Sequence, residues 1–121
     1  MALKEEILNP LQEIAGFLAS ALFSINGETI LLNNASKFDL ASIGAHTVNL
    51  IISALKATKE SGLGKLKQIE VQTDLGILLA RWALEDKYIL GMILEPQGNV
   101  ALAKLELEKI SQQIKKEIQG Q

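Results

Sequence analysis

A single histidine and a single arginine are the side chains of this 121-residue sequence whose types point most directly to catalysis. With one histidine, a metal site built from several histidines is excluded, and a Ser-His-Asp triad would have to be assembled around His46. His46 falls on the polar side of an expected helix, with Ser42 and Asn49 one turn away. We therefore interpret His46 as an exposed histidine, with a partner-binding surface as the alternative, rather than as a catalytic base.

Two further features superficially resemble motifs that act on phosphate groups. An arginine finger stabilises the charge that develops in phosphoryl transfer, but Arg81 lies in the middle of an expected strand, from which it could not reach out, so we expect it to make a structural pairing. The stretch "ESGLGKLK" has one residue between Gly62 and Gly64, and Leu66 follows Lys65. A phosphate-binding loop needs four residues between its glycines and a Ser or Thr after its lysine, so we interpret the stretch as the end of a helix and a turn.

The remaining titratable residues offer no catalytic constellation. The acidic residues are spread singly along the expected helices, without the close pair in an apolar setting that acid-base catalysis uses. The sequence contains no cysteine, which removes disulfides, thiolate nucleophiles and cysteine metal sites together. We therefore predict neither an enzyme nor a bound cofactor or metal.

Length and composition limit the classes of protein to which this chain can belong. A chain of this length is expected to form one domain, residues 1–121, with a substantial core. Hydrophobic residues make up 48%, yet we find no apolar segment of the roughly 18 residues that span a bilayer, so we expect the excess apolar surface to meet another protein chain. A net charge of −2 gives no basic footprint for nucleic acid. The N-terminus "MALKEEILNP" lacks the apolar block of a signal peptide, and we expect a cytoplasmic protein.

The stretch "ALFSINGETILL" predicts two strands joined at Asn26 and Gly27, because both residues tolerate the positive φ of a two-residue hairpin turn. Counting outward from that turn gives the pairs Ile25 with Glu28, Ser24 with Thr29, Phe23 with Ile30, Leu22 with Leu31 and Ala21 with Leu32. These pairs leave large apolar groups on both faces, so the hairpin must be covered on both sides.

The first residues of the chain have the apolar spacing of an amphipathic helix, and Gly16 follows them at the position of a C-terminal cap. The residues of the stripe are Leu3, Ile7, Leu11 and Ile14. Pro10 leaves two alternatives open. Either the helix kinks there, or Asn9 caps a shorter helix with Pro10 in its first turn, and the preceding residues form an arm.

A long helix is expected to begin near Asp39, or near Ser36 if that residue caps it, and to end at Gly62. One narrow polar stripe runs along it, formed by Ser42, His46, Asn49, Ser53, Lys56 and Glu60. An ordinary surface helix has an apolar face of roughly 100° or a little more, whereas this helix is apolar over most of its circumference. We therefore predict a second neighbour along one flank, which Gly44 would allow to approach closely.

Three strands and a closing helix are expected next. "KLKQIEVQT" alternates between apolar and polar residues, a pattern typical of an edge strand, whereas "GILLARWAL" and "YILGMILE" are apolar on both faces and belong inside the sheet. A turn at Asp86 and Lys87 would place Trp82 opposite Gly91. Asn99 then caps the helix "VALAKLELEKISQQIKKEIQ". The predicted order is helix, two strands, helix, three strands, helix.

In this order of elements the chain resembles the Roadblock family, which includes dynein light chains and bacterial gliding-type regulators of small GTPases. The resemblance is carried by "GFLASALFSINGETILL", "DLASIGAHTVNLIISALKATKESG" and "KQIEVQTDLGILLARWALEDKYILGMIL", nearly the whole chain, and Pro10 departs from the family pattern. It implies an α+β fold in three α/β/α layers. A five-stranded antiparallel sheet would carry the long helix on one face and the terminal helices on the other.

The resemblance also implies a homodimer in which the third strands of two subunits join into one sheet and the two long helices lie side by side. The edge-strand pattern and the largely apolar helix agree with this expectation. The residues expected at the dimer interface are Gln68, Ile69, Glu70, Val71, Gln72 and Thr73 on the strand, with Gly44, Val48 and Ile52 on the helix.

Many prokaryotic relatives bind a Ras-like small GTPase across the paired long helices, as scaffolds or as activators that hold the GTPase's own loops. The resemblance therefore implies a non-enzymatic regulator with such a GTPase as its partner. The residues expected to contact it are Ser42, His46, Asn49, Ser53 and Lys56. The alternative is a dimeric structural adaptor in a larger assembly, which would bind its partners without dependence on nucleotide.

Overall fold

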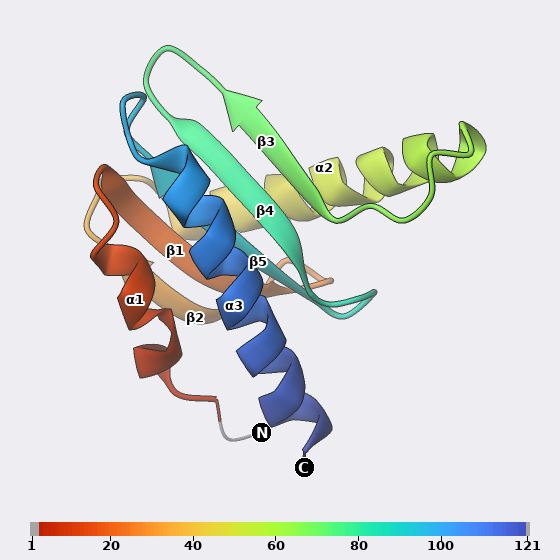
Figure 1. The fold of residues 1–121 in the computed structure, drawn as a ribbon, viewed down its shortest axis with the longest axis horizontal. Helices are drawn as coiled ribbons and strands as arrows, with labels where there is room; N and C mark the ends of the chain where they lie inside the picture. The colour runs from red at the N-terminus through yellow and green to blue at the C-terminus, as the bar shows by residue number, and fades with distance from the viewer. Residues whose placement is uncertain (1–2, 121) are drawn as a thin grey trace.

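A five-stranded antiparallel sheet organises the structure, a computed structural model that describes residues 3–120 (Figure 1). The strands are β1 (Phe17–Ser24), β2 (Thr29–Asn34), β3 (Gln68–Gln72), β4 (Ile77–Leu84) and β5 (Tyr88–Leu94). They lie in the order β2-β1-β5-β4-β3, so β3 is an edge strand, as its alternating sequence predicted. The expected α+β fold and order of elements are confirmed.

Helices cover both faces of this sheet (Figure 1). The long helix α2 (Leu40–Glu60) lies on one face, and α1 (Asn9–Gln12) and α3 (Val100–Gln119) lie on the other, with a 3-10 turn at Glu5–Leu8 before α1. Each face has its own cluster of buried side chains, and neighbouring residues of β1 enter different clusters: Leu22 packs with the α1/α3 side and Phe23 with the α2 side. Successive residues of a strand point to opposite faces, which is why the apolar hairpin needs cover on both sides.

The first helix is shorter than the apolar stripe predicted. Pro10 lies in the first turn of α1, as in the second alternative, but Asn9 is the first residue of the helix and does not cap it. The residues before it form the 3-10 turn Glu5–Leu8 rather than an extended arm. The fully buried residues are Leu8 and Leu11, whereas Leu3 and Ile7 are only partly buried. Because the short turn precedes α1, the inward-facing positions do not follow the single helical stripe that we expected.

The β1–β2 hairpin has the predicted inner pairs and a different tip. Leu22 pairs with Leu31, as predicted, but Phe23 pairs with Thr29, so the register shifts by one residue at Ile30. The pairs predicted nearer the turn are wrong. Gly27 adopts a φ of +88°, and a connection of four residues, 25–28, replaces the two-residue turn. Gly27 closes the turn, where its N–H donates to the Ser24 carbonyl, and Ile30 is the extra residue that restores the predicted pairs farther from the tip.

The β4–β5 hairpin also differs from the predicted register. Its turn has three residues, 85–87, and Asp86 adopts a φ of +67°. Trp82 therefore pairs with Ile89, and the predicted pairing of Trp82 with Gly91 is wrong. Gly91 is instead covered by Phe23 from β1, since a Cβ atom at this glycine would lie 3.4 Å from Phe23 Cε2.

The ends of the two long helices agree with their expected caps. The side chain of Asp39 accepts from the backbone N–H of Ser42 at the start of α2, and the side chain of Asn99 accepts from the N–H of Leu102 at the start of α3. By length and composition α2 is apolar enough to cross a membrane, which corrects our expectation that no segment is. In the structure α2 packs its buried residue Ile51 against the sheet.

Candidate protein-binding surface

The outward side of α2 carries the polar stripe that we predicted as a partner-binding surface. Its residues Ser42, His46, Asn49, Ser53 and Lys56 are all exposed. Three of them, His46, Asn49 and Ser53, line one shallow hollow of about 350 Å³. The structure therefore brings the middle of the stripe together, with Ser42 and Lys56 toward its two ends.

Leu50 is the residue of this surface that the sequence reasoning missed. It lines the same hollow and is 44% exposed. Its position next to Asn49 and four residues after His46 places it at the border of the stripe, which is the signal that would have found it. The hollow thus combines an aliphatic side chain with imidazole, amide and hydroxyl groups. Such a mixture suits a protein contact, in which an apolar anchor is surrounded by hydrogen-bonding groups.

The flank of α2 that we expected to meet a partner helix turns in part toward the protein's own sheet. Gly44 is buried against β1, since a Cβ atom at this position would lie 2.5 Å from Phe23 Cε1. Val48 is only 4% exposed and belongs to the core on this face. Gly44 and Val48 therefore pack within the chain, and their part in a dimer interface stays a prediction. Ile52 is partly buried against the same cluster.

The edge strand β3 carries most of the predicted strand interface. Gln68, Ile69, Glu70 and Val71 are half-buried and Gln72 is exposed. Thr73 lies outside the strand. Its N–H and its hydroxyl both donate to the carbonyl of Gly76, so Thr73 closes the turn between β3 and β4 instead of continuing the strand.

The two sides of β3 face different layers. Ile69 packs with the core on the α2 side. Glu70 faces α3, where it makes an ion pair with Lys104 and accepts a hydrogen bond from Gln72. The hydrogen bond from Lys104 is the main cause that lowers the pKa of Glu70 below its usual value.

Arg81 makes a structural pairing with the neighbouring strand, as expected, but its partner is a neutral amide. Its Nη1 donates to Gln68 Oε1 on β3 at 3.4 Å, a long contact to a neutral amide. Its Nε is buried and has no hydrogen-bond partner among the described residues. Arg81 is therefore held in place on β4 without a carboxylate to balance its charge within residues 3–120.

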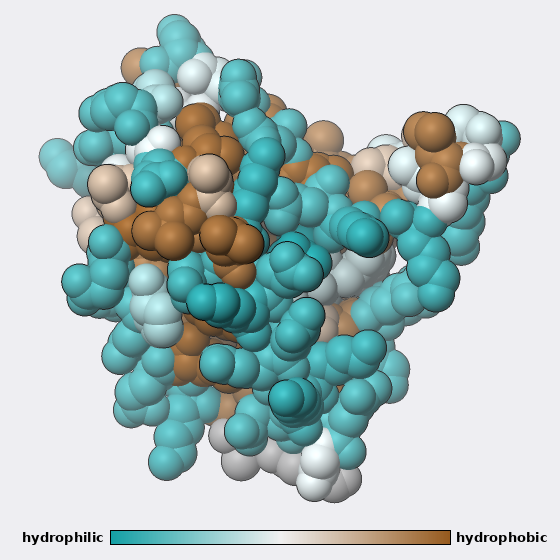
Figure 2. Space-filling view, in the orientation of Figure 1, coloured by the Kyte–Doolittle hydropathy of each residue, from teal (hydrophilic) through white to brown (hydrophobic). Residues whose placement is uncertain are grey.

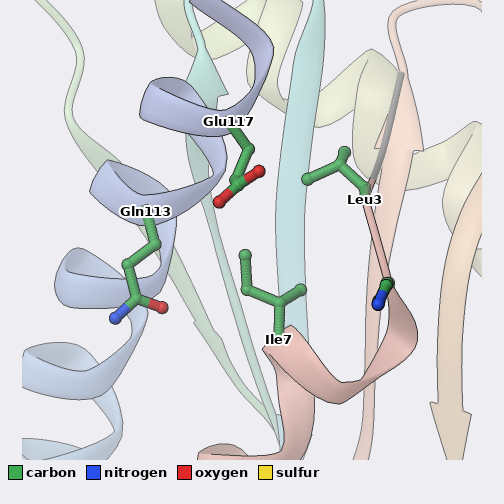
Figure 3. Close-up of a pocket in the computed structure, with 5 residues that line it drawn as sticks. Leu3, Ile7, Gln113 and Glu117 are labelled. Carbon is green, nitrogen blue, oxygen red and sulfur yellow. The ribbon is translucent and has the colours of Figure 1, made fainter. Parts of the chain in front are cut away.

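A separate hollow of about 450 Å³ lies between the N-terminal segment and the C-terminal half of α3. Figure 3 shows Ile7 and Glu117 on opposite walls of it, with Gln113 on the helix and Leu3 above. The lining consists of two aliphatic residues, one lysine, one amide and one carboxylate. Within the described part of the chain, no group of three or more metal-binding side chains comes together.

Comparison with known proteins gives matches among solved structures. No protein-family profile and no curated protein sequence matches the chain. A Roadblock/LC7 domain from Streptomyces avermitilis has a TM-score of 0.86 and 14% identity, covering 96% of this chain and 98% of that one. MglB from Myxococcus xanthus has a TM-score of 0.85 and 16% identity, covering 97% and 95%.

A further MglB structure, described as having a tetrameric arrangement, has a TM-score of 0.82 and 14% identity, covering 90% of this chain and 82% of that one. Similarity at these identities concerns the fold. The three-layer arrangement, the order of elements and the edge position of β3 all agree with it. The chain therefore has the fold of the Roadblock/LC7 domains and the MglB gliding proteins.

Proposed function

We propose that this chain is a non-enzymatic, homodimeric regulator or scaffold that binds a Ras-like small GTPase through the outer side of α2. The observation that carries the proposal is the exposed stripe of α2, whose middle residues His46, Asn49 and Ser53 share one shallow hollow with Leu50. The resemblance to the Roadblock family implies that this helix face meets the GTPase. Binding would position the loops of the GTPase, so stimulation of GTP hydrolysis would need no catalytic side chain from this chain.

Self-association is supported by the edge strand β3. An exposed strand edge is a ready site for pairing with another chain, and pairing two copies of β3 would remove both edges. Figure 1 shows the C-terminal half of α2 extending past β3, where the chain's own sheet does not continue beneath it. A second sheet joined at β3 would lie under this part of the helix. The tetrameric arrangement named for one similar MglB structure also favours self-association.

The test is capture of partners from lysate of the source organism on the immobilised protein, in parallel with a non-hydrolysable GTP analogue and with GDP. We expect a small GTPase to be enriched only with the analogue. Its rate of GTP hydrolysis, with and without this protein, then distinguishes an activator from a tether.

Variants of α2 locate the contact. Replacing His46 and Asn49 together with Asp should weaken capture of the GTPase, because two carboxylates would enter the middle of the stripe. The control replaces Gln12 and Gln113 with Asp, since both residues are exposed on the opposite layer. Equal capture by both double variants would refute the assignment of this face. Recovery of the same non-GTPase proteins with either nucleotide would instead support the dimeric adaptor.

A further inference from the structure

A groove runs between α3 and the strands β3 and β4, on the face of the sheet opposite α2. Two hollows form it, of about 310 Å³ and 550 Å³. They adjoin each other at Lys67 and Arg81, which line both. Figure 2 shows this face of the molecule, where hydrophilic side chains cover most of the surface along α3 and beside β3 and β4.

One side of the groove is a regular stripe of α3. It begins at Ala101, passes Leu105 and Glu108, and ends at Lys115. The first and last of these residues are 14 positions apart, and an α-helix rises about 1.5 Å per residue, so this stripe is about 21 Å long. Leu105 is 57% exposed, so the wall also offers an apolar contact. The groove is thus long enough for a segment of another chain rather than only a small ion.

The groove is positively charged although the whole chain has a net charge of −2. Its charged residues are Lys65, Lys67, Arg81, Lys104 and Lys115, with Glu85 and Glu108. Lys104 is balanced by its ion pair with Glu70. The other four cations exceed the two carboxylates, and a cleft with an excess of one sign of charge attracts ligands of the opposite sign.

Arg81 lies at the centre of this groove, where the two hollows meet, and its side chain is only partly exposed. Its buried Nε has no partner among residues 3–120, and its contact with Gln68 is long. A buried donor without an acceptor costs free energy, and a buried charge costs more unless it is paired. The buried Nε is out of reach of a ligand, but a carboxylate arriving in the groove would balance the guanidinium charge and could accept from both terminal nitrogens at once, a geometry that a lysine cannot provide.

We propose that this groove binds an acidic segment of a second protein, with a carboxylate on Arg81, further acidic side chains near Lys67 and Lys115, and an aliphatic side chain against Leu105. The inference goes beyond the proposed function, because the groove and the stripe of α2 lie on opposite layers. The two surfaces would let one chain hold a GTPase on one face and an acidic segment on the other.

Two unique side-chain signals make the test direct. The sequence contains one arginine and one tryptophan, and both line the groove, so the Arg81 Nε–H and Trp82 Nε1–H resonances of a ¹⁵N-labelled sample need no further assignment. The probe is a peptide of about six residues, which matches the groove length when it is extended, with the sequence Glu-Leu-Asp repeated twice. The control peptide has the sequence Lys-Leu-Arg. We expect a saturable shift of the Arg81 signal with the acidic peptide only.

Matched charge reversals locate the binding. Lys67→Glu combined with Lys115→Glu should weaken binding of the acidic peptide by about tenfold or more, because two attractive contacts become repulsive. Lys87→Glu combined with Lys116→Glu makes the same change of net charge at exposed positions outside the groove, and should change the affinity by less than about threefold.

Three results would overturn the proposal. The first is an Arg81 signal that does not respond to the acidic peptide up to about 1 mM at low salt, weaker than most specific contacts. The second is equal binding of the basic peptide. The third is an equal loss of affinity in the two double variants, which would mean that binding of the peptide depends only on the net charge of the protein.

Discussion

Lys104 Nζ lies 2.6 Å from Glu70 Oε1, so an ion pair joins α3 to the edge strand β3. Gln72 donates to the other carboxylate oxygen of Glu70, also at 2.6 Å. Both contacts favour the charged form of the carboxylate, and the contribution of Lys104 is the larger. The strand expected at the dimer edge is therefore tied to the helix that forms one wall of the basic groove.

Glu70→Gln should lower the free energy of unfolding at neutral pH by about 0.5 kcal/mol, because the pair is accessible to solvent. The folded pKa of Glu70 is below its ordinary value of 4.5. This stabilisation is therefore fully present above that value and is lost as the pH falls through the lowered pKa. Urea denaturation of both proteins across this range measures it. Glu106→Gln, which removes an ion pair within α3, is the control. A difference that stays constant with pH would contradict the prediction.

Gly44→Ala should destabilise the protein by about 1–3 kcal/mol, since the added methyl group would lie 2.5 Å from Phe23 Cε1 in a packed core. The better helix propensity of alanine offsets part of this cost, by about 1 kcal/mol. Adding Phe23→Leu should recover part of the loss, because the smaller side chain makes room. Chemical denaturation of the two single variants and the double variant measures this coupling. Additive effects would show that the two residues do not compete for the same space.

Glu70→Pro should convert the proposed dimer to a monomer. Thr73 donates to Gly76 across the β3–β4 turn, and the pairing alternates along the strands, so the N–H of Glu70 points away from β4 to the open edge, where proline cannot donate. Glu70→Gln also loses the ion pair with Lys104 but keeps the backbone N–H, so it is the matched control. Sedimentation velocity gives the oligomeric state, and circular dichroism shows whether the proline variant is still folded. A folded Glu70→Pro protein that remains dimeric would exclude β3 as the interface.

Asn99→Ala should cost about 1 kcal/mol of stability, because the Asn99 side chain accepts from the N–H of Leu102 at 3.1 Å at the start of α3. Asp39→Ala should cost less, since the corresponding contact to the Ser42 N–H is longer, at 3.4 Å. Thermal or urea unfolding of the two variants compares them. A larger loss for Asp39→Ala would reverse the expected ranking of the two caps.

Local patterns in the sequence determined the elements and part of the candidate site. The caps at Asp39 and Asn99 and the two-residue alternation of β3 each depend on residues close together in the chain. The polar stripe of α2 follows from helical spacing, and its residues are exposed as expected. These features need no knowledge of which segments meet in space.

Tertiary structure decided the contacts between segments. Phe23 of β1 lies against both Gly91 of β5 and Gly44 of α2, so a glycine expected to face a partner helix faces the protein's own sheet. The turn residues Gly27 and Asp86 set the hairpin registers. Arg81 makes no ion pair among the described residues, although Glu85 and Glu108 line the same groove, and the carboxylate of Glu70 on β3 pairs with Lys104 of α3 instead. Packing of side chains from distant segments determines each of these relationships, and helical or strand periodicity cannot predict that packing.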